Sequence, residues 1–158
     1  RRQRQMCIRD RGILQEWDTP FHIYYKPANR FIANSIGQGN MVPGLSIDQH
    51  TITTELGKLK SETPNNWPCN TPVEVLIRPD EIILADTGGI DAKVDQKVFS
   101  GRATLYRFRL PMGSCVEAML PSHENYALGE SVHIKAKVSH LVVFSKLDLV
   151  TAQPPLSE

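Results

Sequence analysis

Side chains that bind metals or act as nucleophiles are scattered along this chain rather than grouped. The histidines and cysteines lie at His22, His50, His123, His133, His140, Cys7, Cys69 and Cys115. Zinc ligands usually follow one another at short, regular spacings, and the triplet Cys115, His133 and His140 has no such spacing. The sequence also contains neither a G-x-x-x-x-G-K-[ST] phosphate loop nor a G-x-S-x-G nucleophile elbow. The residue types therefore predict no catalytic residue, no metal site and no bound cofactor.

Two carboxylates stand side by side at Asp80 and Glu81, directly after Arg78 and Pro79. Acid–base catalysis needs groups that face one substrate, whereas neighbouring residues in a turn usually point apart, so we interpret the pair as a solvated turn or cap. The turn residues Arg78, Pro79 and Asp80, with Trp67 in a loop between prolines, are candidate contacts for a second subunit or a ligand. The alternatives are a strand-ending turn with a local ion pair and, for Trp67, a cover over the β-domain.

Two further segments suggest binding functions. Segment 86–91, Asp-Thr-Gly-Gly-Ile-Asp, is able to form a nest of backbone N–H groups for a small oxyanion, although a plain loop explains it more simply. Residues 106–109, Tyr-Arg-Phe-Arg, interleave aromatic and basic side chains, as oligonucleotide-binding barrels do. Because alternate residues of a strand point to opposite faces, a buried aromatic face and a solvated basic face explain these residues more simply. We therefore expect no nucleic-acid partner.

The net charge of +1 conceals a basic N-terminus. Residues 1–11 carry five of the 18 basic side chains and one of the 17 acidic ones, which leaves 13 basic and 16 acidic residues elsewhere. The net charge of residues 12–158 is therefore negative and does not favour the binding of nucleic acid. Residues 1–11 show no helix or strand periodicity, and we interpret them as a non-native or disordered tail. A nucleic-acid arm is the alternative.

Length and composition indicate one globular domain with a small addition. A chain of 158 residues with 41% hydrophobic and 22% charged side chains is able to bury a core. No apolar run approaches the roughly 18 residues of a membrane-spanning helix, and the N-terminus does not resemble a secretory signal. The three widely spaced cysteines fit a reducing compartment better than a disulfide framework.

Residues 12–37 predict a short strand followed by two connector helices. Thr19-Pro20 supplies an N-cap and a first helical residue. Pro27 ends this first helix, because its ring blocks the preceding turn. A second helix restarts at Ala28 or Asn29, and we expect Gly37 to end it in the left-handed conformation.

From residue 38 onward the pattern changes to short strands. The expected strands, which are separated by turn-rich segments such as 61–72, are 41–47, 50–56, 73–78, 82–84, 94–100, 102–110, 115–120, 131–138 and 141–144. Alternation within them indicates one buried and one solvated face. Many short strands with glycine and proline turns favour a mainly β fold, a small β-barrel or sandwich, over residues 38–148. The polar, proline-containing segment 149–158 predicts a flexible tail.

Three segments resemble parts of the C-terminal region of the ATP-binding subunit of ABC importers. In that family a run written G-R-I-x-Q-x-G-T-P-x-x-I-Y-x-x-P-x-N-x-F-V-A-x-F-I-G-x-x-N ends the nucleotide-binding domain, and residues 12–40 are similar to it. Residues 75–82 are similar to the family's V-x-I-R-P-E-D-I, and residues 128–130, Leu-Gly-Glu, form a third, less specific match. Trp17-Asp18 in place of the usual glycine, together with residues 37–40, resembles the ferric-iron-type branch.

The resemblance implies a fold and a parent function. Residues 12–37 would be the C-terminal remnant of the ATPase domain, and residues 38–148 an OB-like regulatory β-domain of the transport-associated OB (TOBE) type. The parent would use ATP and Mg to drive solute uptake at the cytoplasmic face of the inner membrane, with a second copy and the membrane subunits as partners.

The nucleotide loop, signature motif and Walker B strand of that family do not occur in this sequence. By itself the chain would therefore be no enzyme. Its role would be to steady the subunit pair and to receive a small regulatory ligand. A stand-alone small-oxyanion-binding module and an OB-fold oligonucleotide binder are the alternatives.

Overall fold

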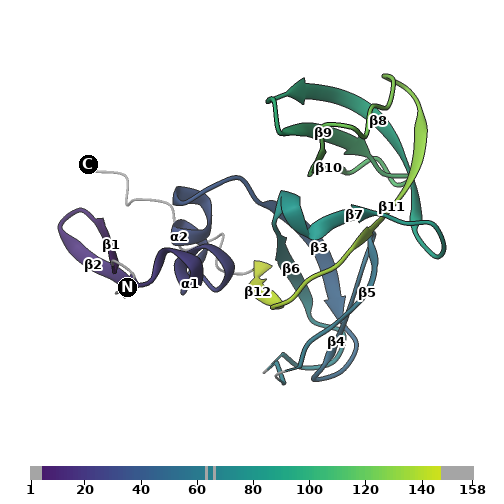
Figure 1. Ribbon diagram of the computed structural model, residues 1–158. Helices are drawn as coiled ribbons and strands as arrows, with labels where there is room; N and C mark the ends of the chain where they lie inside the picture. Colours follow the sequence, from purple (N-terminus) through teal and green to yellow (C-terminus); the bar gives the residue numbers. More distant parts are fainter. Residues whose placement is uncertain (1–4, 63, 66, 147–158) are drawn as a thin grey trace, which may run out of the picture.

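The computed structural model describes residues 5–146 apart from 63 and 66, and shows a chain built mainly of β-strands (Figure 1). The strands are β1 (Met6–Asp10), β2 (Ile13–Asp18), β3 (Asn40–Ser46), β4 (Thr51–Thr54), β5 (Gly57–Lys60), β6 (Pro72–Ile77), β7 (Ile82–Leu84), β8 (Ile90–Phe99), β9 (Ala103–Arg109), β10 (Cys115–Pro121), β11 (Ser131–Ala136) and β12 (Val142–Ser145). The helical elements are α1 (Pro20–Tyr25), α2 (Arg30–Ser35) and the 3-10 turn η1 (Pro79–Glu81). The expected fold class, mainly β with two short helices ahead of a β-domain, is confirmed. The tail predicted at 149–158 lies outside the described residues.

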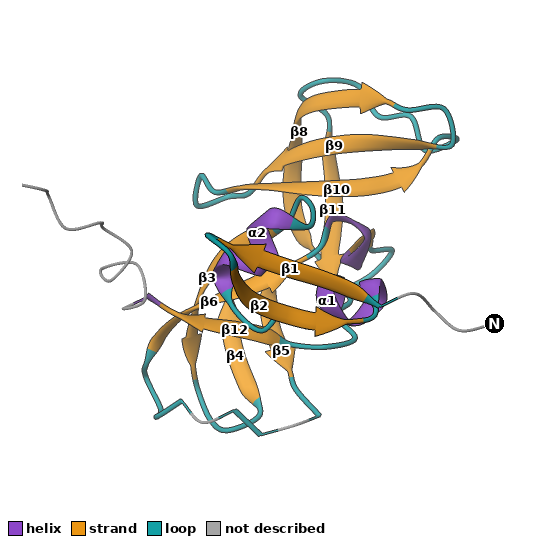
Figure 2. Ribbon diagram, turned by 90° about the vertical axis from the view of Figure 1, so that its left-hand side faces the viewer, coloured by secondary structure: helices purple, strands orange, loops and turns teal. Residues whose placement is uncertain are grey.

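Two five-stranded antiparallel sheets enclose one main core. Their strand orders are β12-β6-β3-β4-β5 and β10-β9-β8-β11-β7. The fully buried members of the core come from both sheets and include Ile52, Val73, Val75, Ile77, Tyr106, Phe108, Ala118 and Ile134. Strand β10 also lies against β7 and η1, so the second sheet curls back and the β-domain approaches a closed, OB-like barrel (Figure 2).

Strand β6 is buried on both faces, which explains its continuous apolar sequence. Val75 and Ile77 belong to the main core, whereas Leu76 points to the opposite face of the sheet and is also buried. There Leu76 packs with Ala33 of α2 and Phe144 of β12 in a second, smaller cluster. Helix α2 thus covers the outer face of this sheet, and a strand that is covered on both faces has no reason to alternate.

A hairpin precedes the helices where the sequence predicted a tail. Strands β1 and β2 pair with Asp10 opposite Ile13. The turn residues Arg11 and Gly12 have φ values of +47° and +82°, as a two-residue type I′ turn requires. The interpretation of residues 1–11 as a disordered tail is therefore wrong for residues 6–10, and residues 1–4 lie outside the described part. Strand pairing satisfies backbone groups whether or not the side chains are periodic, so this strand had no sequence signal.

Helix α1 begins where Thr19-Pro20 predicts, and α2 begins at Arg30, just after the start expected at Ala28 or Asn29. The Thr19 hydroxyl accepts a hydrogen bond from the His22 N–H at 3.4 Å, and Pro20 is the first residue of α1. Asn29 caps α2 by accepting from the Ile32 N–H at 3.0 Å. None of the described helices has the length and apolar character needed to span a lipid bilayer.

The end of α2 differs from the expectation. The C-cap is Ile36, with φ −97°, and Gly37 has no positive φ, so the left-handed stop predicted at Gly37 is wrong. A Cβ atom at Gly37 would instead lie 3.0 Å from Cε2 of Tyr24, which is tighter than a normal contact. Glycine avoids this contact where α1 approaches the chain after α2.

One strand was missed in the first sheet. The sequence predicted a single strand over 50–56, but β4 ends at Thr54 and β5 begins at Gly57, and the two pair directly. Gly57 has φ +99°, a conformation that breaks an extended run. The short, lysine-rich β5 lies at the edge of its sheet, where charged residues are common and the apolar signal is weak.

Candidate functional site

Arg78 ties the two connector helices to the β-domain. Its side chain is 1% exposed, although it follows the last residue of β6 in a turn. Nη1 donates to the carbonyl oxygens of Ala33, Gly37 and Gln38, each at 3.2 Å. Nε and Nη2 donate to the carbonyl oxygen of Tyr24 at 3.0 and 2.7 Å. We refer to Arg78 and these four carbonyl groups as the arginine clasp.

The arginine clasp satisfies backbone groups that helices cannot satisfy internally. Tyr24 and Ala33 lie in the last turns of α1 and α2, where carbonyl groups lack an intrahelical partner and carry partial negative charge. The guanidinium also lies 4.2 Å above the ring centre of Tyr24, a favourable cation–π position. Burial lowers the pKa of Arg78, but a guanidinium remains charged at neutral pH. The clasp is therefore a fixed cation held by dipoles.

Glu81 holds the turn that carries Arg78. Its Oε2 accepts from the Arg78 backbone N–H at 2.9 Å, and its own carbonyl oxygen accepts from the Lys137 N–H at 2.7 Å. Glu81 is 7% exposed, and burial raises the pKa of its carboxyl group. Asp80, by contrast, is exposed and faces α1. The two carboxylates thus point apart, as expected for a turn or cap rather than an acid–base pair.

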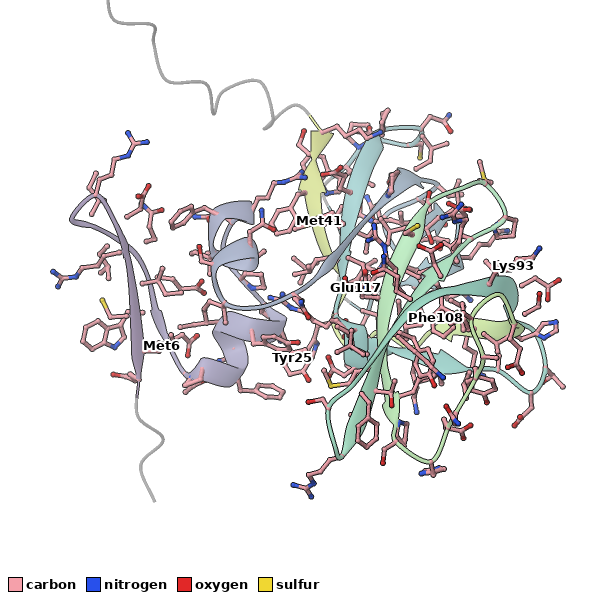
Figure 3. All side chains as sticks on the ribbon, turned by 90° about the horizontal axis from the view of Figure 1, so that it is seen from above. Met6, Tyr25, Met41, Lys93, Phe108 and Glu117 are labelled. Atoms are coloured by element: carbon pink, nitrogen blue, oxygen red, sulfur yellow. The ribbon has the colours of Figure 1, made fainter. Side chains whose placement is uncertain are left out.

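Asp80 borders a shallow hollow between the connector and the β-domain. Its carboxylate accepts from the Tyr25 hydroxyl at 2.6 Å and from the Tyr24 hydroxyl at 3.4 Å. The hydrogen bond to Asp80 raises the pKa of Tyr25 to about 12. The hollow measures about 440 Å³ and is lined by Tyr24, Tyr25, Gly37, Gln38, Pro79, Asp80 and Met119. Figure 3 shows Tyr25 on the connector side of this junction and Phe108 within the barrel.

Asn40 closes the seam between the two sheets next to this junction. Its side-chain amide donates to the carbonyl oxygen of Glu117 at 2.8 Å, and its Oδ1 accepts from the Glu117 N–H at 2.7 Å. Nδ2 also lies 3.2 Å from the carbonyl oxygen of Ile77. One side chain thus replaces a rung of strand pairing between β3 and β10, which keeps the barrel closed beside the arginine clasp.

The structure separates the candidate contact residues. Arg78 is not available to a partner, because its guanidinium is buried and fully engaged with backbone carbonyls rather than with a local ion pair. Pro79 is buried, and Asp80 is the exposed member of the turn. Trp67 is partly buried against the main core, so it covers the barrel, and it does not line the hollow beside Asp80. A contact role for Asp80 stays a prediction.

Segment 86–91 covers most of the loop between β7 and β8 and the first two residues of β8. Asp91 pairs with His133 across the sheet, with 3.0 Å between Oδ1 and Nε2. The carboxylates of Asp86 and Asp91 flank the loop glycines, and negative charge at both ends opposes the binding of an oxyanion there. The simpler interpretation as a loop therefore fits the geometry better. Within the described residues, no group of three or more His, Cys, Asp or Glu side chains is placed to hold a metal ion.

The aromatic residues of β9 belong to the core. Tyr106 and Phe108 are fully buried and stacked, with ring centres 5.5 Å apart. Arg107 and Arg109 point outward, and Arg109 pairs with Asp95 at 2.7 Å. The division into a buried aromatic face and a solvated basic face is confirmed, so these rings offer no stacking platform for bases.

A second hollow, which the sequence did not reveal, lies at the tip of the β8–β9 hairpin. It measures about 400 Å³ and is lined by Lys97, Phe99, Thr104, Ser122 and Asn125. We call it the hairpin-tip hollow. Lys97 lies opposite the core residue Tyr106, because a bulge between Val94 and Gln96 shifts the phase of β8. Strict alternation from Ala92 and Val94 would place Lys97 on the outer face, so the sequence pattern alone does not predict its position.

A third hollow separates the connector from the β11–β12 loop. It measures about 740 Å³ and its lining includes Lys26, Lys60, Glu62, Ser139 and His140. Lys26, Lys60 and Glu62 are exposed, so charges of both signs face solvent. We call it the connector groove.

Comparison with known proteins identifies the β-domain. Residues 75–144 match the family described as the TOBE domain. The fold is similar to that of the cytoplasmic molybdate-binding protein ModG in a crystal structure with molybdate bound, with a TM-score of 0.58 and 12% sequence identity over 67% of this chain and 95% of that chain. An identity this low shows a shared fold alone. The mainly β domain that follows the connector helices therefore contains a TOBE domain.

Proposed function

We propose that this chain is a regulatory module whose TOBE domain binds a small oxyanion and passes its binding state to the segment before the connector helices. The observation that carries the regulatory part is the arginine clasp, because its buried guanidinium binds the ends of both connector helices and belongs to the β-domain. The binding part is supported by the fold shared with a molybdate-binding protein and by lysine-lined hollows on the β-domain.

The proposed regulation follows from differential affinity. An oxyanion that binds one arrangement of the β-domain more tightly than another shifts the population toward the first. Arg78 donates to carbonyl groups at the ends of α1 and α2, so its guanidinium contacts both helices at once. A shift in the β-domain is thereby transmitted to both helices, which is the coupling that regulation requires.

Oxyanion binding is tested by thermal unfolding and calorimetry. Molybdate, sulfate and phosphate are titrated at constant ionic strength, with chloride as the control anion. At roughly a hundred times the Kd, binding adds about 2.7 kcal/mol to the unfolding free energy, which corresponds to a rise in Tm of about 5 to 10 °C for a chain of this size. If none of the three oxyanions raises the Tm above the chloride control, the oxyanion function is excluded.

A second candidate is the C-terminal part of the ATP-binding subunit of an ABC importer. The observation that favours it is that two of the three matching segments, 12–40 and 75–82, meet in the arginine clasp. Arg78 comes from one of them, and Tyr24, Ala33, Gly37 and Gln38 come from the other. In this proposal the parent couples ATP hydrolysis to solute uptake at the cytoplasmic face of the inner membrane, with ferric iron as the solute. Its partners are a second copy of the subunit and the membrane subunits.

This second candidate predicts separable properties. The chain of 158 residues should show no ATP turnover and no rise in Tm with Mg-ATP, because the sequence contains no phosphate loop. Sedimentation should show a concentration-dependent dimer. The coding sequence before residue 12 should contain a G-x-x-x-x-G-K-[ST] loop, and a reading frame without one would exclude the importer subunit.

A further inference from the structure

The hairpin-tip hollow lies at the end of the β8–β9 hairpin, where the inner face of the second sheet extends beyond the main core. Phe99 pairs with Thr104, and Lys97 pairs with Tyr106, so all four side chains share the core face of the β8–β9 ribbon. Tyr106 is fully buried, whereas Phe99 is 70% exposed. The core face is therefore covered at one end and open at the tip, and Lys97 and Thr104 lie at the boundary.

Thr104 presents a hydroxyl group without a partner to this hollow. Its side chain is among the buried polar residues, at 5% exposure. Within the described part of the chain, no hydrogen bond to its hydroxyl group is found. Every described side-chain N or O atom that is inaccessible to solvent has a hydrogen-bond partner, so the Thr104 hydroxyl must be accessible. The hydroxyl therefore opens into the hollow that Thr104 lines. A nearly buried hydroxyl costs free energy unless something in the hollow bonds to it.

Lys97 supplies the positive charge of the hollow. Nζ donates to Oδ1 of Asn125 at 3.1 Å and to the carbonyl oxygen of Tyr126 at 3.0 Å. An ammonium group has three donors and no acceptor, so one donor remains for a ligand. Because Oδ1 of Asn125 accepts from Lys97, the amide NH2 of Asn125 forms the other end of that side chain and adds two donors.

The surrounding charges leave Lys97 unopposed. The carboxylate next to Asn125 in sequence is that of Glu124, whose Oε2 accepts from the Tyr126 hydroxyl at 2.7 Å and whose Oε1 lies 3.8 Å from Nε2 of His123. Glu124 does not line the hollow. The ammonium of Lys97 is thus held by neutral carbonyl oxygens, and among the described residues it forms no ion pair with a carboxylate.

We propose that the hairpin-tip hollow is the oxyanion site of the TOBE domain, an inference that rests on the proposed function. A tetrahedral oxyanion would receive a charged hydrogen bond from Lys97 and neutral ones from the hydroxyl groups of Thr104 and Ser122 and the amide of Asn125. Charge-assisted bonds of this kind are the stronger ones, so Lys97 supplies most of the affinity. The hydroxyl groups of Thr104 and Ser122 would fix the orientation of the oxyanion.

The binding also has a route into the core. The Tyr106 hydroxyl donates to the Glu124 carbonyl oxygen at 2.8 Å and accepts from the Tyr126 N–H at 3.1 Å. Segment 122–126, which carries Ser122 and Asn125, is therefore anchored to a fully buried core residue. An oxyanion that tightens this segment onto Lys97 acts on the barrel through Tyr106.

The test compares matched variants by calorimetry with molybdate, sulfate and phosphate at constant ionic strength. Lys97→Gln removes the charge and keeps amide donors for the Asn125 and Tyr126 oxygens. Thr104→Val removes the hydroxyl and keeps the shape. We expect Lys97→Gln to weaken binding by about tenfold or more and Thr104→Val by about fivefold. Lys60→Gln, the same change in the connector groove, should leave the affinity within about twofold.

The outcomes distinguish the site from the function. Suppose that the wild type binds an oxyanion and that Lys60→Gln weakens this binding, whereas Lys97→Gln and Thr104→Val do not. The site then lies in the connector groove, and this inference is wrong while the proposed function stands. If the wild type binds none of the oxyanions, the proposed function itself is wrong. Amide chemical shifts of the wild type on titration with molybdate give an independent answer should a variant not fold. Shifts confined to residues near 97, 104 and 122 support the site, and shifts confined elsewhere overturn it.

Discussion

Arg78 and Thr104 are both buried polar residues of the β-domain, but their surroundings differ. Arg78 is 1% exposed and donates to four backbone carbonyl groups. Thr104 is 5% exposed, and its hydroxyl has no partner within the described part of the chain. A buried polar group with all its partners stabilises one arrangement of the fold, whereas one without a partner costs free energy until a ligand or water supplies it. The comparison separates a structural polar cluster from the polar cluster proposed to bind an oxyanion.

The same comparison changes what the sequence resemblance means. The Arg-Pro-Asp turn lies in a segment that resembles the family and is a candidate contact for partners, yet its arginine faces inward and joins two parts of the same chain. Lys97 and Thr104 belong to no segment that was singled out, yet they line an open hollow. A residue type that recurs for structural reasons is easily taken for a functional one.

The largest expected effect comes from breaking the arginine clasp. Arg78→Met leaves the carbonyl groups of Tyr24, Ala33, Gly37 and Gln38 without their shared donor. Each buried unsatisfied group costs about 1–3 kcal/mol, and with partial hydration we expect a loss of about 4–6 kcal/mol in unfolding free energy. Urea denaturation measures it, with the exposed Arg107→Met as the control, which should change stability by about 0.5 kcal/mol or less. A loss below about 1 kcal/mol would show that the clasp is not what holds the connector.

The next effect concerns the two faces of α2. Ile32 is fully buried and Phe31 is 45% exposed. We expect Ile32→Ala to cost about 2–4 kcal/mol and Phe31→Ala less than about 1.5 kcal/mol, because only the first leaves a cavity. Urea denaturation of both variants is the measurement. If Phe31→Ala is as damaging as Ile32→Ala, α2 is packed on both faces, and the connector is part of the barrel core.

A smaller effect separates partnered from unpartnered hydroxyl groups. In the absence of oxyanions, Thr104→Val should change the unfolding free energy by less than about 0.5 kcal/mol, because the hydroxyl that it removes opens into the hollow and bonds to no protein group. The matched change Thr54→Val should cost about 1–2 kcal/mol. The Thr54 hydroxyl donates to the Gly57 carbonyl oxygen at 3.0 Å and accepts from the Leu56 N–H at 3.1 Å. Equal losses in both variants, measured by thermal unfolding, would contradict the difference drawn here between Thr104 and Arg78.

The smallest expected effect is a pH dependence that originates beside the arginine clasp. Burial raises the pKa of Glu81 above its ordinary value of 4.5, so the folded protein holds this proton more tightly than the unfolded chain does. The contribution of Glu81 is therefore most favourable below that ordinary value and is lost as the pH rises through the raised pKa of the folded state. Glu81→Gln keeps an oxygen acceptor for the Arg78 N–H and does not titrate. Denaturation from about pH 4 to 7 should show the variant gaining relative to the wild type as the pH rises, and parallel curves would refute the assignment.

Much of the fold could be predicted from local patterns. Thr19 and Asn29 cap helices because side-chain oxygens satisfy free N–H groups wherever a helix starts. The alternation of residues 103–109 predicts which side chains are buried, because a strand has a period of two. The hairpin strand β1, the edge strand β5 and the conformation of Gly37 could not be predicted in this way. Strand pairing and the close approach at Gly37 depend on a second segment of the chain, whereas a local pattern describes only one segment.

The sequence by itself determined the mainly β class, the capped connector helices and the inner face of β9, since each depends on neighbours along the chain. Only the tertiary structure decided what the polar residues do. Arg78 became a clasp because the carbonyl ends of α1 and α2 converge on the end of β6. Lys97 came to face the hairpin-tip hollow because one bulge shifts the phase of β8. A polar side chain is bound to whatever surrounds it in space, and that environment is set by segments distant in the chain.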